Sequence, residues 1–310
     1  MQAFVFPGQG SQSVGMLADL AQQYSEVQQC FAEASDTLGY DLWQLVQQGP
    51  AEELNSTHIT QPALLTSSVA IWRVWLNLNG RKPEYLAGHS LGEYSALVCA
   101  GVLSFADAVK LVEQRGQYMQ QAVPAGTGGM FAIIGLDDEK VIECCQQAAG
   151  QQVVSAVNFN SPGQVVIAGH VEAVERAGAL CKEAGAKRAL PLPVSVPSHC
   201  ALMLPAAEQL EKALANVEFS APQIPVINNV DVKQEMSAQN IKSALVRQLY
   251  SPVRWTETVQ SLAQLGATNQ FEIGPGKVLS GLGKRIDASV NCSAINTVET
   301  VTAALQQGNE

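Results

Sequence analysis

A serine between two glycines, placed between a short strand and an apolar helix, is the feature that most constrains the fold of this chain. Residues 85–87 (YLA) predict a short strand, Gly88-His89-Ser90 follows as a turn, and residues 91–100 predict a helix that is apolar on nearly every side. A Gly-x-Ser-x-Gly turn between a strand and a helix pushes the serine hydroxyl outward at the carboxyl end of a sheet. We therefore expect a sheet whose strands are followed by packed helices.

Other parts of the chain predict strands that alternate with helices. An apolar run at 3–6 ends at a Pro-Gly turn, and residues 61–79 predict a helix capped by Thr60, with Pro62 in its first turn. Helices and strands alternate again from 202 to 295. This order predicts a mostly parallel sheet covered on both faces, and the serine turn makes it an α/β-hydrolase-like core.

Residues 128–192 have a different order of elements. Their periodicity predicts β-α-β-β-α-β, which is the order of a ferredoxin-like unit, and Gly and Pro punctuate both ends of the segment. The predicted fold class is α/β, with a ferredoxin-like small domain inserted into the parallel-sheet core. We expect the core domain to comprise 1–124 and 197–310, and the inserted domain to comprise 125–196.

Composition and charge exclude several classes of protein. The formal net charge of -10 argues against non-specific nucleic-acid binding, and no run of 18 apolar residues predicts a membrane span. The first ten residues predict a strand and not a signal peptide. Seven irregularly spaced cysteines without C-x-x-C fit reduced thiols in the cytoplasm, and four histidines without metal-ligand spacing predict no metal site.

Ser90 is the candidate nucleophile. The N-terminus of the following helix supplies free N–H groups that suit an oxyanion, and the alternative is a serine that caps a core helix. A serine nucleophile needs a base. We expect His89 to be structural and His58 and His170 to lie in surface loops or turns. His199 follows Pro197 where the chain returns from the inserted segment, so it is placed to face an interdomain cleft.

Arg115 is the second candidate functional residue. It lies in the middle of a predicted helix, and its neighbours three and four positions away are apolar or aromatic (Leu111, Val112, Tyr118 and Met119). A buried guanidinium is costly unless it is paired. Either a carboxylate of the protein or an anion of the ligand balances this charge.

These features occur together in a known family. The chain resembles the malonyl-CoA:acyl-carrier-protein transacylases of bacterial fatty acid synthesis over essentially its whole length, including the inserted unit. The motifs that carry the resemblance occur in the family's order: FPGQGSQ at 6–12, GHSLGEYSA at 88–96, Arg115-Gly116, VSVPSH at 194–199 and GPGKVL at 274–279. VPSH does not match the usual malonyl signature of the related polyketide synthase domains, but it fits a stand-alone enzyme.

The resemblance implies a role for each residue of the catalytic centre. Ser90 is the acylated nucleophile, and His199 is its base. The backbone carbonyl of Gln248 orients the histidine in place of an acidic residue. The backbone N–H groups of Gln9 and Leu91 form the oxyanion hole.

The resemblance also implies how the substrates bind. Arg115 holds the malonyl carboxylate, and Gln61 and Asn158 line the acyl site, unless they serve ordinary polar packing. The substrates are malonyl-CoA and a holo-acyl carrier protein whose phosphopantetheine carries the acceptor thiol, so the protein needs no cofactor of its own. We expect a cytoplasmic monomer. The candidates for carrier docking are two exposed basic pairs, for which an ordinary solvated face is the alternative: Lys187, Arg188, Lys284 and Arg285.

Three other functions remain open at this point. A serine esterase or phospholipase would use the same Ser–His pair and let water resolve the acyl-serine. The acyl-transfer subunit of a malonate decarboxylase complex would share Ser90, His199 and Arg115 but serve another carrier. A non-catalytic carrier-binding scaffold would need none of these side chains.

Overall fold

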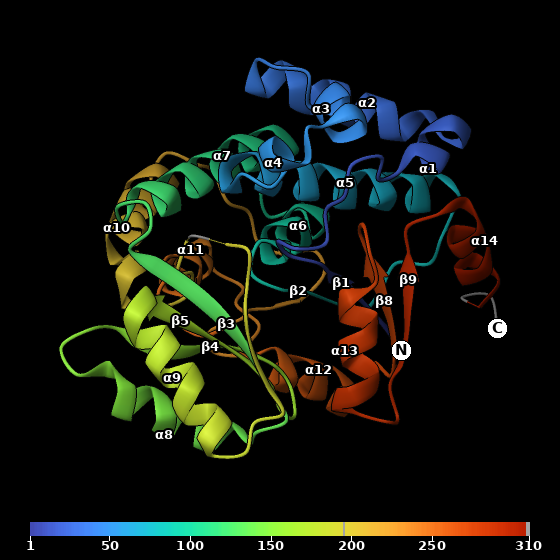
Figure 1. Cartoon of the computed structure of the whole chain (residues 1–310). Helices are drawn as coiled ribbons and strands as arrows, with labels where there is room; N and C mark the ends of the chain where they lie inside the picture. Colours follow the sequence, from blue (N-terminus) through green and yellow to red (C-terminus); the bar gives the residue numbers. More distant parts are fainter. Residues whose placement is uncertain (195, 308–310) are drawn as a thin grey trace.

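A five-stranded parallel sheet forms the larger body of the molecule. The computed structural model describes residues 1–194 and 196–307, and Figure 1 shows this sheet between helices. Its strand order is β7-β2-β1-β8-β9, and β1 pairs in parallel with both β2 and β8. The strands are β1 (Gln2–Phe6), β2 (Tyr85–Gly88), β7 (Val226–Ile227), β8 (Asn269–Ile273) and β9 (Asn291–Ile295).

Both faces of this sheet are covered, as the alternation of elements predicts. Phe4 and Phe6 of β1 belong to the large apolar core that contains α5 (Thr57–Asn77) and α6 (Gly92–Cys99). The intervening Ala3 and Val5 belong to a second cluster on the other face. The helices of that second face are α12 (Trp255–Gln264) and α13 (Val278–Ile286). Successive side chains of a strand point to opposite faces, so β1 contributes to both cores.

Further helices enclose the core. Long helix α7 (Phe105–Gln121) packs against α5, and Ser104 caps it by accepting a hydrogen bond from the Asp107 amide at 3.1 Å. The turn Ala201–Met203 leads into α10 (Leu204–Leu214), which packs against α11 (Ala238–Gln248). Five helices that the sequence reasoning did not identify complete the body: α1 (Ala18–Gln23), α2 (Ser25–Leu38), α3 (Leu42–Gln48), α4 (Ala51–Leu54) and α14 (Val298–Gln307).

The inserted segment forms a four-stranded antiparallel sheet. Its strand order, β4-β5-β3-β6, is that of a ferredoxin-like unit, which confirms the predicted fold class. One face packs on two helices, and Met130 and Val157 of the other face pack with Cys200 of the larger body. The exact domain boundaries stay a prediction. The elements are β3 (Gly128–Ile134), α8 (Asp138–Ala149), β4 (Val154–Ser161), β5 (Gln164–His170), α9 (Val171–Glu183) and β6 (Arg188–Pro191).

The predicted start of α5 was wrong. The helix begins at Thr57, so Thr60 lies inside it and does not cap it, and Pro62 is its sixth residue. A Cβ on Gly116 of α7 would lie 2.5 Å from the His58 Cα, so α7 packs directly on the first turn of α5. This tertiary contact extends the helix beyond the predicted cap, and it places His58 on a helix and not in a loop.

All seven cysteines are buried free thiols. Among the described residues, no group of three or more His, Cys, Asp or Glu side chains is placed to hold a metal ion. No described helix combines the length and the apolarity that a membrane span requires.

Candidate active site

The turn between β2 and α6 holds Ser90 in a strained backbone conformation. Its φ of 53° lies in the left-handed region, which non-glycine residues rarely adopt. The two glycines of the motif allow β2 and α6 to approach β1 and each other. A Cβ on Gly88 would lie 1.9 Å from the Gly92 carbonyl carbon, and a Cβ on Gly92 would lie 2.0 Å from the Phe6 carbonyl oxygen. Neither position accommodates a side chain, which explains the spacing of the motif.

His199 meets Ser90 across 109 residues of sequence. The serine Oγ lies 2.8 Å from His199 Nε2, and His199 Nδ1 lies 2.7 Å from the backbone oxygen of Gln248. A carbonyl oxygen only accepts, so Nδ1 carries the proton and Nε2 is free to accept the serine proton. Burial, assisted by the nearby Arg115 charge, lowers the pKa of His199 to about 3. The imidazole is therefore neutral and ready to act as a base at neutral pH.

Two backbone amides next to the serine have the properties of an oxyanion hole. Gln9 and Leu91 both line the cavity that contains Ser90. Among the described residues, neither backbone amide donates a hydrogen bond to a protein acceptor. Free amide donors beside a nucleophile stabilise the negative charge that develops on an attacked carbonyl. The oxyanion-hole role of both residues stays a prediction.

Arg115 is buried and surrounded by neutral partners. Its side chain is 1% exposed, Nη1 donates to Gln61 Oε1 at 2.7 Å, and Nη2 donates to Gln248 Oε1 at 2.9 Å. The same Nη2 lies 3.4 Å from Ser90 Oγ. No carboxylate of the described residues pairs directly with this guanidinium. Of the two alternatives that the sequence leaves open, this geometry favours a ligand anion as the balancing charge.

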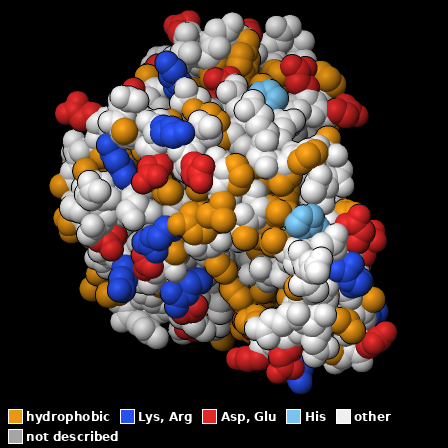
Figure 2. All heavy atoms as spheres, turned by 90° about the vertical axis from the view of Figure 1, so that its left-hand side faces the viewer, with side chains coloured by type: hydrophobic (Ala, Val, Ile, Leu, Met, Phe, Trp, Pro, Cys, Tyr) orange, Lys and Arg blue, Asp and Glu red, His pale blue; other side chains and the backbone are white. Residues whose placement is uncertain are grey.

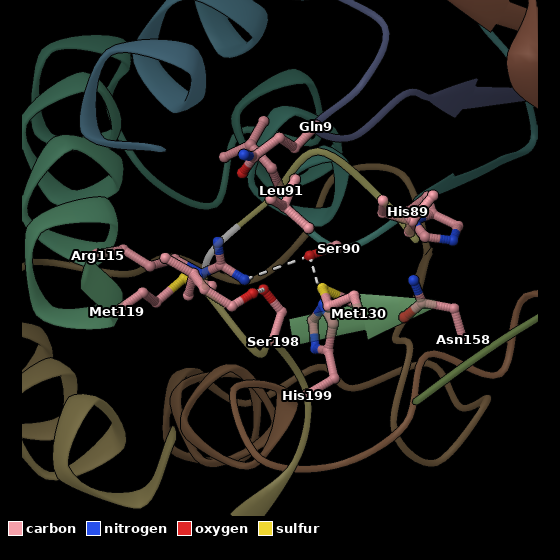
Figure 3. A pocket seen from close by; sticks show the side chains of 13 residues that line it. Gln9, His89, Ser90, Leu91, Arg115, Met119, Met130, Asn158, Ser198 and His199 are labelled. Atoms are coloured by element: carbon pink, nitrogen blue, oxygen red, sulfur yellow. Dashed lines mark hydrogen bonds between the residues drawn. The ribbon is translucent and has the colours of Figure 1, made fainter. Parts of the chain in front are cut away.

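The cavity at Ser90 lies between the two bodies of the molecule. It measures about 120 Å³ and is largely apolar. Figure 2 shows hydrophobic side chains along a hollow between the larger and smaller bodies, and Figure 3 shows Ser90 between His199 and Arg115. The larger body supplies the catalytic pair and Arg115. The inserted unit and the segment that follows it supply Met130, Asn158, Leu192 and Val194.

The two polar residues predicted for the acyl site occupy different positions. Asn158 of β4 lines the cavity, and its Oδ1 is buried without a hydrogen-bond partner in the described structure. Gln61 is only 1% exposed and lies behind Arg115, whose guanidinium it binds. Gln61 therefore supports the arginine, and it does not form part of the cavity wall.

The other histidines make structural contacts. His89 Nε2 lies 2.8 Å from Asn160 Oδ1, and its ring packs on Trp255. This agrees with the structural role expected for it. His58 contacts Gln120 near the surface, and His170 ends β5, where it accepts a hydrogen bond from the Val153 amide. His170 was expected in a loop or turn, but the strand extends to it.

The four docking candidates are exposed and gather at one end of the small sheet. Arg285 Nη1 donates to Oε1 of Gln164, the first residue of β5, at 3.1 Å. The preceding Gly163 accepts a hydrogen bond from the Gly135 amide, and Lys187 packs against Gly135. Arg188 begins β6, four residues before Leu192 of the cavity. At the usual strand rise, it lies roughly 13 Å from the cavity wall. The last of the four, Lys284, precedes Arg285 on α13.

A buried polar network beneath the serine was not anticipated. The Asn229 side chain accepts a hydrogen bond from the Ser90 amide at 2.8 Å, and Glu93 accepts from the Asn229 amide and the Gln248 side chain. A glutamate in a helix that is otherwise apolar is costly for the same reason as Arg115, and this signal could have identified Glu93. The polar pair at 228–229, directly after a buried strand, could have identified Asn229.

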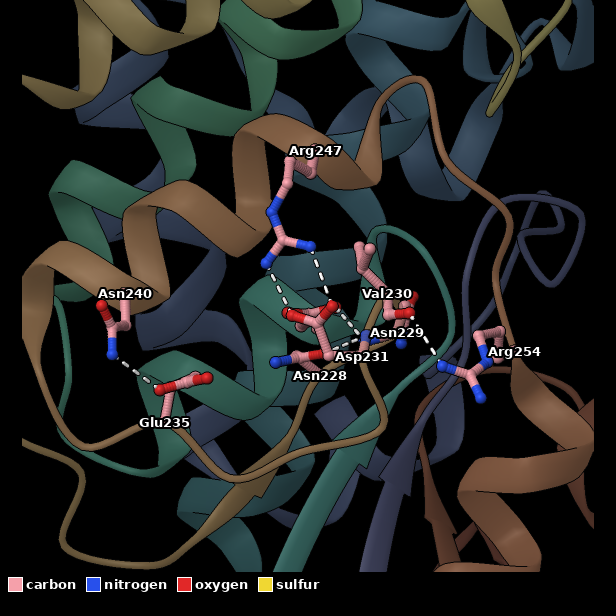
Figure 4. A network of polar contacts seen from close by, with 9 residues as sticks. Asn228, Asn229, Val230, Asp231, Glu235, Asn240, Arg247 and Arg254 are labelled. Carbon is pink, nitrogen blue, oxygen red and sulfur yellow. Dashed lines mark hydrogen bonds and ion pairs between the residues drawn. The ribbon is translucent and has the colours of Figure 1, made fainter.

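An ion pair lies next to this network and connects two of the segments that form it. Arg247 binds Asp231 through two hydrogen bonds, at 2.9 and 2.6 Å, as Figure 4 shows. Arg247 directly precedes Gln248, and Asp231 lies two residues after Asn229. The pair therefore connects the end of α11 to the loop that supports the serine turn.

Comparison with known proteins identifies the family. The acyl transferase domain family matches residues 3–301. The malonyl CoA-acyl carrier protein transacylase of Salmonella typhimurium is 67% identical over 305 residues, which cover 98% of this chain and 99% of the relative. The chain belongs to the malonyl CoA-acyl carrier protein transacylase family. The resemblance stated from the sequence motifs is therefore confirmed.

Solved structures of this transacylase family have the same fold. An acyl carrier protein S-malonyltransferase from Vibrio cholerae is 68% identical, with a TM-score of 0.96 over 97% of this chain and 98% of that chain. A malonyl-transacylase solved in complex with a type II PKS acyl-carrier protein is 64% identical, with a TM-score of 0.98 over 98% of this chain and 99% of that chain.

Proposed function

We propose that this protein transfers a malonyl group from CoA to the phosphopantetheine thiol of a holo-acyl carrier protein, through a malonyl-serine intermediate. Family membership supports this activity, and one observation carries its chemistry. The Ser90–His199 pair shares its cavity with a buried arginine that has no carboxylate partner among the described residues. A nucleophile beside a guanidinium with no direct carboxylate partner suits an acyl group that ends in a carboxylate.

In the first half-reaction, Ser90 attacks the thioester. His199 Nε2 takes the serine proton as Oγ bonds to the carbonyl carbon, and the Gln9 and Leu91 amides stabilise the oxyanion. The tetrahedral intermediate collapses, the carbon–sulfur bond breaks, and His199 returns the proton to the CoA thiol. The products are free CoA and a malonyl ester of Ser90.

In the second half-reaction, the carrier's thiol enters the same cavity. His199 takes the thiol proton, the sulfur attacks the ester carbonyl, and Ser90 leaves with the proton that His199 returns. The acceptor thiol follows CoA into one site, so the kinetics are ping-pong. The phosphopantetheine belongs to the partner, and the protein itself uses no cofactor.

The proposal includes the cellular setting. The protein serves fatty acid synthesis in the cytoplasm as a monomer, and sedimentation at micromolar concentration tests the oligomeric state. The carrier protein of this pathway is acidic, so it needs a local basic surface on a protein whose net charge is -10. We assign this docking surface to the basic cluster of Lys187, Arg188, Lys284 and Arg285.

The experiment is intact-protein mass spectrometry after a brief incubation with malonyl-CoA. Acetyl-CoA and a Ser90→Ala variant are the controls. A malonyl adduct that requires Ser90 and is discharged by holo-carrier protein supports the transacylase. An adduct that water discharges equally fast indicates a hydrolase. Failure of the folded protein to form any adduct would contradict the catalytic proposal. A non-catalytic scaffold that binds the carrier protein would then be the remaining function.

A further inference from the structure

Glu93 is a buried carboxylate at the centre of the site to which the mechanism above gives no role. It lies three residues after Ser90 on α6 and is 2% exposed. Its Oε2 accepts hydrogen bonds from Gln248 Nε2 at 2.8 Å and from the Asn229 amide at 3.0 Å. Both donors belong to groups that touch the catalytic residues, so the position of this carboxylate is transmitted to the reacting centre.

The first connection sets the orientation of the Gln248 side chain. A guanidinium only donates hydrogen bonds, so Arg115 requires the oxygen end of the Gln248 amide. The nitrogen end must then find acceptors, and the closest is Glu93 Oε2, followed by the Ser90 carbonyl oxygen at 3.0 Å. A flipped amide would place its NH₂ against the guanidinium and its oxygen against the carboxylate. Asn229 Oδ1 is a third acceptor, at 3.3 Å, so the carboxylate accepts the shortest of the three hydrogen bonds that hold the amide in the orientation that supports Arg115.

The second connection supports the serine turn. The Asn229 amide is held by Glu93, and its side chain spans the turn: Oδ1 accepts from the Ser90 amide at 2.8 Å, and Nδ2 donates to the Gly88 oxygen at 2.6 Å. These bonds brace the residue whose φ of 53° is strained. Loss of these bonds would slow acylation of Ser90 by every acyl donor. Loss of the Gln248 orientation would slow acylation only by donors whose carboxylate binds Arg115.

We propose that Glu93 is a positioning residue for malonyl selection, and that its carboxylate fixes the Gln248 amide so that Arg115 is held ready for the malonyl carboxylate. This inference rests on the proposed function. It assigns to the Glu93 oxygen a role in specificity beyond support of the fold. The ratio of malonyl to acetyl transfer onto Ser90 measures this role. Damage to the serine turn slows both acyl donors alike and therefore cancels in the ratio.

Two substitutions separate the acceptor oxygen from the charge. Glu93→Gln keeps an oxygen that can occupy the Oε2 position and removes the charge. Glu93→Asp keeps the charge, but its side chain is shorter by one methylene, so the carboxylate oxygen lies further from Gln248 Nε2. We expect the malonyl-to-acetyl ratio of single-turnover acylation to stay within about threefold of wild type in Glu93→Gln, and to fall about tenfold in Glu93→Asp, as for loss of a hydrogen bond to a charged group. The reverse order would show that charge alone matters and would overturn the proposal.

A double variant tests whether the effect passes through the arginine. Arg115→Ala removes the group that the Gln248 amide supports, so adding Glu93→Asp should leave the ratio unchanged. A further tenfold fall in that background would mean that Glu93 acts by another route, and an unchanged ratio in Glu93→Asp alone would also overturn the role. Circular dichroism and thermal unfolding confirm that each variant is folded. A wild-type protein that forms no malonyl-serine would defeat both proposals, whereas a normal wild-type adduct with unchanged ratios defeats only this one.

Discussion

Arg115 holds a positive charge where water is almost excluded. Burial lowers the pKa of Arg115, which means that the charged form is destabilised and that an anionic ligand would restore the lost stabilisation. Its present partners, Gln61 and Gln248, are neutral amides that orient the guanidinium without neutralising it. Selectivity for a carboxylated acyl group then follows, because acetyl leaves the arginine unpaired.

The Arg115→Ala variant tests this selectivity. We expect kcat/KM for malonyl-CoA to fall roughly 30- to 5,000-fold, the equivalent of about 2–5 kcal/mol, because the carboxylate loses a desolvated partner. Acetylation of Ser90 should persist. Steady-state kinetics with malonyl-CoA and mass spectrometry with acetyl-CoA measure the two quantities. Full malonyl activity in the purified variant would remove Arg115 from the mechanism.

His199 gives a prediction about pH. Its pKa of about 3 lies below the ordinary value of 6.5, so the imidazole stays neutral when the pH falls from 8 to 5. Titration of His199 should therefore leave the rate of Ser90 acetylation nearly flat over that range. Burial is the main cause of the shift and Arg115 is the second, so Arg115→Ala should raise the pKa and move the acid limb to higher pH. Mass spectrometry of quenched reactions at a series of pH values measures the acid limb of the rate profile in wild type and in the variant. The same acid limb in both proteins would contradict the electrostatic coupling between Arg115 and His199.

At the scale of elements, the serine turn depends on how closely α6 approaches β1. Gly92→Ala would place a Cβ 2.0 Å from the Phe6 carbonyl oxygen, which is backbone and has little room to move. We expect this variant to lose about 3 kcal/mol or more of unfolding free energy, together with its acylation activity. Urea unfolding measures the stability.

The matched control is Gly281→Ala in α13. A Cβ at Gly281 meets no heavy atom within 4 Å, and the residue lies inside a helix. Alanine there should stabilise the protein by about 0.5–1 kcal/mol, because it restricts the unfolded chain and favours the helix. Equal changes in unfolding free energy at Gly92 and Gly281 would show that the close approach of α6 to β1 does not require a glycine at position 92.

Local sequence signals predicted most elements but not how distant ones meet. The serine turn and Arg115 were recognisable because their evidence lies within one helix and its neighbours. The contact of Ser90 with His199 spans 109 residues, and spacing alone left the histidine only a candidate until the family resemblance assigned it. Asn229 and Glu93 were missed because their hydrogen-bond partners lie in other segments of the chain, although the polarity of each residue beside apolar neighbours was a usable signal. The helices of residues 18–54 were missed because much of their stability comes from tertiary packing, of α2 and α4 on α5 and of α1 and α3 on α2.

At the scale of the whole molecule, Glu93 connects the site to overall stability. Burial raises the pKa of Glu93 from 4.5 to about 7, so the folded state binds more protons than the unfolded state between these values. Its stabilising contribution is complete below pH 4.5 and is lost as the pH rises through 7. The change is on the order of 3 kcal/mol.

The Glu93→Gln variant should lack this dependence on pH. Relative to Glu93→Gln, wild type should lose unfolding free energy between pH 5 and pH 8. His199 has the opposite dependence, but it is present in both proteins and cancels in the difference. Urea unfolding at the two pH values gives the comparison. Parallel stabilities of the two proteins would mean that Glu93 titrates normally.

Docking of the carrier also belongs to the whole molecule. Lys187→Glu with Lys284→Glu should raise the KM for holo-carrier protein about tenfold, because two exposed attractions become repulsions. Acylation of Ser90 by malonyl-CoA should not change. Lys110→Glu with Lys140→Glu alters the net charge equally at exposed sites outside the basic cluster and should leave both half-reactions intact. Equal effects of the two double variants on the carrier KM would exclude a local docking surface.

Gln248 serves the site with two chemically separate parts of one residue. Its main-chain oxygen orients His199, and its side chain supports Arg115. The genetic code can replace the side chain but not the carbonyl, so no amino-acid replacement deletes the acceptor that holds the base. Selectivity for the acyl group can therefore vary during evolution while the general base keeps its tautomer. An alanine scan, in consequence, would report only on the side chain of Gln248, with its contacts to Arg115 and the Ser90 carbonyl, and would miss the part of its main-chain oxygen in proton transfer.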